Sequence, residues 1–79
     1  MTPTLDTAIT SLLDALRDTE DPVQRYEAIR DAEARLLAAF KAERAAIASD
    51  LHSDRSWAQV GSMLGVTGSR AEQISRATR

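Results

Sequence analysis

Apolar residues recur at helical spacing along most of the chain. From Leu5 to Leu16 they fall at steps of three and four, with Leu5, Ile9, Leu12, Leu13 and Leu16 on one stripe. This is the period of one helix face. The pattern therefore predicts an amphipathic helix over about residues 4–17.

A second, longer helix is predicted after a short acidic break. Asp21 can cap its N-terminus, and Pro22 suits its first turn, where no N–H donor is required. No Gly or Pro follows until residue 61, and Ala, Glu, Arg and Leu dominate as far as Leu51, which favours one uninterrupted helix within residues 22–52. Thirty helical residues span roughly 45 Å. We expect the shorter first helix to fold back antiparallel on the N-terminal half of the long helix.

The last third of the chain has the pattern of two short helices joined by a tight turn. Trp57, Val60, Met63 and Leu64 predict one buried helix face, and Ser53 or Asp54 is the expected cap. Gly65 can end this helix in a left-handed conformation. The next residues predict a second helix, capped by the Thr67 hydroxyl, with Ala71 and Ile74 inward. Gly61 is small enough to let the two helices cross closely.

These features together are typical of a helix-turn-helix. The stretch SWAQVGSMLGVTGSRAEQI, residues 56–74, resembles region 4 of bacterial sigma factors. It is still more similar to small actinobacterial proteins that carry this motif behind a helical N-terminal segment. The resemblance implies DNA binding through a recognition helix at about residues 67–78. One departure is Gly68, because such helices often begin with a polar pair, so one base-reading side chain is missing.

The expected fold is thus all-α, with an N-terminal helical hairpin, a long central helix and a C-terminal helix-turn-helix. We predict that residues 1–52 form a dimerisation segment and residues 53–79 a DNA-binding segment of one compact domain. Of the 34 apolar residues 14 are Ala, and so small a core is often completed by oligomerisation. The predicted dimer interface consists of Leu13, Leu16, Tyr26 and Ile29. The alternative is a bent second helix that closes a monomeric bundle.

Charge is distributed unevenly and favours the DNA-binding interpretation. Net charge is −2 overall, but residues 1–54 carry −5 and residues 55–79 carry +3, and such asymmetry is informative about partners. Helical spacing places three side chains on the outward face of the second short helix as candidates for reading bases. These are Ser69, Gln73 and Arg76, and the expected phosphate contacts are Arg55, Thr67, Arg70 and Arg79.

Other classes of protein find little support in the sequence. The glycines lack the lysine and strand of a phosphate-binding loop, and no nucleophile has an adjacent His. There is no Cys, and His52 has no second ligand at metal-binding spacing. We therefore expect no enzyme, no cofactor and no metal. No apolar run reaches the roughly 20 residues of a membrane span, and a cytoplasmic protein of the nucleoid is expected.

Three functions compete at this point. The first is a homodimeric, sequence-specific transcriptional regulator that binds double-stranded DNA. The second is a nucleoid-associated architectural protein that binds many short sites. The third is a sigma-like module that binds RNA polymerase or another regulator, which the acidic N-terminal part would suit.

Overall fold

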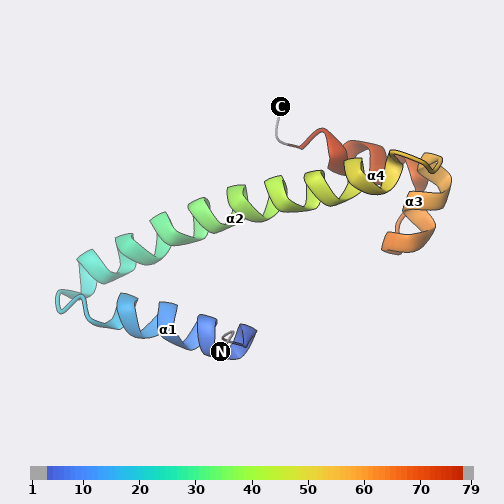
Figure 1. Ribbon diagram of the computed structural model, residues 1–79. Coiled ribbons are helices and arrows are strands. Elements are labelled where there is room, and N and C mark those ends of the chain that lie inside the picture. The colour runs from blue at the N-terminus through green and yellow to red at the C-terminus, as the bar shows by residue number, and fades with distance from the viewer. Residues whose placement is uncertain (1–3, 78–79) are drawn as a thin grey trace. The chain divides into compact units, whose positions relative to one another are not determined.

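The computed structural model describes residues 4–77, and these residues form four helices and no strand (Figure 1). The predicted all-α class is therefore confirmed. The helices are α1 (Leu5–Arg17), α2 (Pro22–His52), α3 (Trp57–Leu64) and α4 (Gly68–Ser75).

Helix α1 begins and ends as its sequence predicts, but it has no buried residue. The Thr4 hydroxyl accepts a hydrogen bond from the Thr7 backbone N–H at 3.1 Å, which caps the N-terminus. The apolar stripe is present, yet Leu13 retains 42% of its exposure and only Leu16 is half-buried. The stripe thus remains available for further packing. The expected folding-back of α1 on α2 stays a prediction.

Helix α2 is the long helix that the sequence predicts, and it runs without a break from Pro22 to His52. The Asp21 carboxylate accepts from the Gln24 N–H at 2.9 Å and caps the first turn. The Arg25 guanidinium, in the first turn of α2, reaches back to the segment before the helix. It donates to the carbonyls of Thr19 and Glu20 at 2.8 and 3.1 Å. These bonds fix the connection between α1 and α2.

The chain divides into two compact units between Ala34 and Arg35, so that α2 contributes to both. In the described part of the first unit no residue is buried. The second unit contains the core, which consists of small residues: Ala45, Ala48, Val60, Gly61 and Ala71. Val60 is its largest fully buried side chain. Small residues allow the helices of this unit to approach closely.

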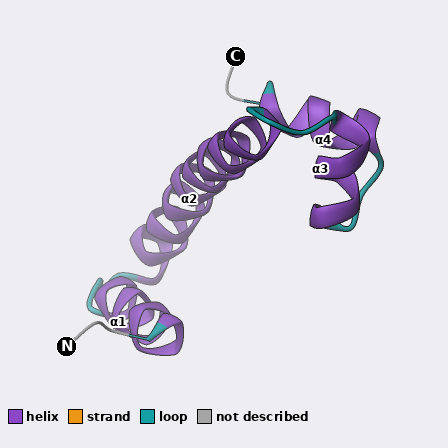
Figure 2. Ribbon diagram, turned by 45° about the vertical axis from the view of Figure 1, so that its right-hand side comes forward, coloured by secondary structure: helices purple, strands orange, loops and turns teal. Residues whose placement is uncertain are grey.

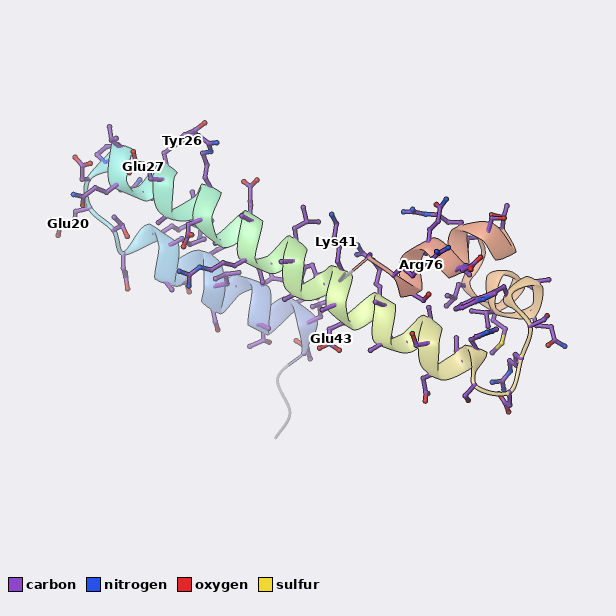
Figure 3. The ribbon with its side chains drawn as sticks, turned by 90° about the horizontal axis from the view of Figure 1, so that it is seen from above. Glu20, Tyr26, Glu27, Lys41, Glu43 and Arg76 are labelled. Carbon is purple, nitrogen blue, oxygen red and sulfur yellow. The ribbon has the colours of Figure 1, made fainter. Side chains whose placement is uncertain are left out.

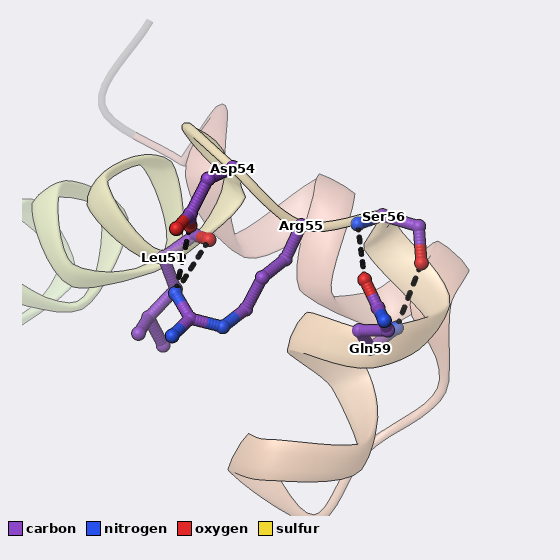
Figure 4. A network of polar contacts seen from close by, with 5 residues as sticks. All are labelled: Leu51, Asp54, Arg55, Ser56 and Gln59. Carbon is purple, nitrogen blue, oxygen red and sulfur yellow. Dashed lines mark hydrogen bonds and ion pairs between the residues drawn. The ribbon is translucent and has the colours of Figure 1, made fainter.

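Helix α3 begins with a complete capping box at Ser56. The Ser56 hydroxyl accepts from the Gln59 N–H at 3.1 Å, and the Gln59 side-chain oxygen accepts from the Ser56 N–H at 2.9 Å (Figure 4). The prediction of Ser53 or Asp54 as the cap was therefore wrong. Asp54 instead forms an ion pair with Arg55 at 2.9 Å. The guanidinium of Arg55 also donates to the Leu51 carbonyl, near the end of α2, at 3.4 Å.

A short turn joins α3 to α4 (Figure 2) and has the features that the sequence predicts. Gly65 adopts φ +74°, in the left-handed region, and ends α3. The Thr67 hydroxyl accepts from the Arg70 N–H at 3.0 Å and caps α4. A Cβ built on Gly61 would lie 2.6 Å from the Thr67 carbonyl carbon. A glycine is thus required for the turn to pass over α3 at this distance.

Two of the residues predicted for the buried face of α3, Met63 and Leu64, are exposed in the structure. The expected inward residue Met63 retains 54% of its exposure.

His52 is half-buried, and its ring stacks on Trp57 with centroids 3.7 Å apart. Its Nδ1 atom is buried without a hydrogen-bond partner. The stack links the last turn of α2 to the first turn of α3.

None of the helices within residues 4–77 is long and apolar enough to cross a membrane.

Candidate nucleic-acid interface

The outward face of α4 presents the three predicted base-reading side chains. Ala71 is fully buried and Ile74 half-buried, which fixes the inward side of the helix. Ser69, Gln73 and Arg76 are all exposed. The helix ends at Ser75, earlier than the predicted residue 78, so that Arg76 occupies the C-cap position rather than the helix proper. Residue 78 lies outside the described residues.

Gly68, the departure from the sigma-like pattern, has a packing role. A Cβ at this position would lie 3.1 Å from the Cα and N atoms of Ala58 in α3. Gly68 therefore faces the start of α3 rather than solvent. A side chain here would disturb the contact between the two helices and would not extend the outward face of α4.

The predicted phosphate-contacting residues fall into different environments. Arg70 is exposed and has no ion pair among the described residues. Arg55 binds Asp54 and the end of α2, as described above. The Thr67 hydroxyl accepts in the cap and retains its own proton as a donor. Arg79 lies outside the described residues.

An exposed ion pair involves one of the base-reading candidates. Arg76 Nη2 lies 3.2 Å from Glu72 Oε1, one turn earlier in the sequence. Both side chains are about half exposed, and such surface pairs contribute little stability. The guanidinium of Arg76 can therefore exchange this carboxylate for another acceptor at small cost.

The structure brings two further cations next to α4 that sequence reasoning missed. Lys41 and Arg44, one turn apart on α2, line a cleft of about 200 Å³ together with Arg70, Gln73, Ile74 and Ala77 of the C-terminal segment. Their spacing of three residues was visible in the sequence. However, both belong to the segment of residues 1–54, whose net charge of −5 conceals them. Dividing the chain at Ala34 instead gives −5 for residues 1–34 and +3 for residues 35–79.

A neighbouring apolar cavity of about 260 Å³ is partly open, since Ile47 and Leu64 in its lining are exposed. Ile47, Leu64, Val66 and Ile74 line it, and Arg44 stands at its edge. In the structure Val66 is half-buried at the wall of this cavity.

Three of the four residues of the predicted dimer interface are exposed within the first unit. Tyr26 retains 63% of its exposure, Leu13 42% and Ile29 37%. Leu16 is half-buried. Whether these four side chains meet a second copy stays a prediction.

Comparisons with known proteins give no relative on which to base a function. No family model matches the chain, and neither a curated protein nor a solved structure matches it.

Proposed function

We propose that the protein binds double-stranded DNA sequence-specifically, as a small homodimeric transcriptional regulator, with α3, the turn and α4 acting as a helix-turn-helix. The observation that carries the proposal is the close, glycine-dependent crossing of α3 and α4. This crossing leaves one side of α4 open, where Ser69, Gln73 and the C-cap residue Arg76 are all exposed. A helix presented in this way fits the major groove.

The chemistry of the exposed side chains suits the reading of base edges. Gln73 can form two hydrogen bonds with adenine, and Arg76 can do so with guanine after leaving Glu72. The Ser69 hydroxyl, near the N-terminus of α4, can donate to or accept from a base edge, and it can donate to a phosphate oxygen. Arg70 has no competing carboxylate among residues 4–77 and is therefore the stronger phosphate contact. Arg55 must first exchange Asp54 for the phosphate.

The lack of buried side chains in the first unit supports the homodimer. In the proposal this unit folds as a helical hairpin. Its two helical segments bury no side chain completely within the described residues. Ordering a chain costs roughly 1–2 kcal/mol per residue in backbone entropy alone, and burial of apolar surface must offset this cost. A second copy packed over Leu13, Leu16, Tyr26 and Ile29 would supply that burial. It would also add a second recognition helix and double the phosphates neutralised.

Selection of bound fragments from a pool of random duplex DNA tests the proposal. We expect a short inverted repeat to be enriched, because two recognition helices related by twofold symmetry read two half-sites roughly 34 Å apart. Fluorescence anisotropy with the enriched duplex and a scrambled duplex then measures the preference. Recovery of many unrelated sequences with equal affinity would favour the architectural alternative. Absence of binding at low salt would refute the proposal.

A further inference from the structure

The cleft between α2 and α4 gathers positive charge, and the described residues that line it supply no counter-charge. Lys41 and Arg44 approach it from α2, and Arg70 approaches it from α4. No carboxylate is among the residues within 4–77 that line it. None of the three cations forms an ion pair with another described residue. Three unpaired cations around one cleft repel one another, and an anion between them would relieve that repulsion.

Nearby carboxylates are directed elsewhere. Glu43 points to the opposite side of α2 from Lys41 (Figure 3). Glu72 forms its ion pair with Arg76. The positive charge of the cleft is thus not neutralised by its immediate neighbours in sequence.

The position of the cleft beside the outward face of α4 indicates which anion fits. Arg70, Gln73 and Ala77 line the cleft at steps of three and four along the C-terminal segment, and Gln73 is also one of the base-reading candidates. A helix fills most of the width of the major groove, which is about 12 Å. Gln73 lies where the cleft meets the outward face, whereas Arg70, at the flank of the helix, meets the phosphate backbone rather than the bases.

We propose that Lys41 and Arg44 of α2, together with Arg70 of α4, form a phosphate-binding cleft, and that its ligand is a backbone phosphate of the DNA beside α4. This inference rests on the proposed function. It extends the interface from the two short helices to the long helix. Lys41 and Arg44 are then positioning residues, since a phosphate contact fixes the register of α4 in the groove without reading sequence.

The double variant Lys41→Gln, Arg44→Gln tests the cleft, with binding to the selected duplex measured between 0.05 and 0.3 M salt. Loss of two phosphate contacts should reduce the slope of log affinity against log salt by about 1.8. It should weaken binding roughly 60-fold at about 0.1 M salt, by the same relation. The preference for the selected over the scrambled duplex should be unchanged. Circular dichroism checks that the exposed substitutions leave the fold intact.

A matched control makes the same change in net charge within the first unit. Arg17 and Arg30 belong to the first unit and are exposed. The variant Arg17→Gln, Arg30→Gln should retain the salt slope of the wild type. Equal losses in both double variants would show that only the overall charge matters and would overturn the inference. An unchanged slope in Lys41→Gln, Arg44→Gln would overturn it as well, while leaving DNA binding intact.

Inorganic phosphate separates this inference from the proposed function. We expect a saturable change in the NMR signals of the Arg44 and Arg70 side-chain Nε–H groups when phosphate is added in a chloride background. If the wild type binds no duplex, the proposed function fails. Saturable shifts would then retain the cleft as a phosphate site and refute DNA as the source. Absence of both shifts and DNA binding would refute the cleft itself.

Discussion

Substitution of Gly61 by Ala would test the crossing of α3 and α4 on which the proposed interface depends. The added Cβ would lie 2.6 Å from the carbonyl carbon of Thr67 and 2.7 Å from the carbonyl oxygens of Val66 and Thr67. Non-bonded carbon atoms normally approach to about 3.5–4.0 Å. The turn must therefore retreat by about 1 Å. All three contacts are backbone atoms, so no flexible side chain can move aside.

The expected loss of stability follows from two opposing effects. Ala is favoured over Gly inside a helix by about 1 kcal/mol. Overpacking of a tight contact costs typically 1–3 kcal/mol and occasionally more, and the rigid backbone contacts place Gly61→Ala at the upper end. We expect a net loss of about 2 kcal/mol. For a chain of this length, that corresponds to a decrease in Tm of roughly 10 °C.

Thermal unfolding followed by circular dichroism measures this loss. Ser62→Ala is a suitable control, because Ser62 is exposed in the same helix and the substitution also raises helix propensity. Its Tm should stay the same or rise slightly. If Gly61→Ala were as stable as Ser62→Ala, the close passage of the turn over α3 would be wrong.

Three further changes test other parts of the structure. Thr67→Ala removes the cap of α4 and should lower stability by about 1 kcal/mol in urea unfolding, whereas Thr67→Ser should not. Val60→Ala, at a fully buried position, should cost about 2 kcal/mol; a loss below a few tenths would exclude Val60 from the core. Leu13→Asp should convert the proposed dimer to monomer in light scattering, because a charge at an apolar interface is costly to bury. A wild-type monomer at high micromolar concentration would contradict the dimer.

The helices and the turn could be predicted because their causes are local. Asp21 and Pro22 start α2, and Gly65 and Thr67 end α3 and start α4, through bonds between residues a few positions apart. Apolar spacing alone places Ala71 on the inward face of α4. These features need no knowledge of the rest of the chain.

Features that depend on distant residues could not be predicted in the same way. Ser53, Asp54 and Ser56 are all good caps, and the choice depends on where α2 ends and how Arg55 binds its last turn. From the sequence alone, Gly68 indicates a missing base contact. The structure shows instead that Gly68 packs closely against Ala58 of α3.

The same limit applies to the cations of α2. Lys41 and Arg44 look like ordinary exposed residues in the sequence. The cleft that they form with α4 depends on the placement of that helix beside them.

The central claim is that the outward face of α4 reads DNA bases. The variant Gln73→Ala tests this claim most directly. Binding of the wild type, Gln73→Ala and Arg70→Ala is measured on the selected duplex and on single-base variants of it, at two salt concentrations. Gln73→Ala should lose about 1–3 kcal/mol of discrimination at one base pair, whereas Arg70→Ala should weaken all sequences equally and reduce the salt slope by about one. If Gln73→Ala retains both the affinity and the sequence preference of the wild type, the assignment of α4 as the reading helix through this face is contradicted.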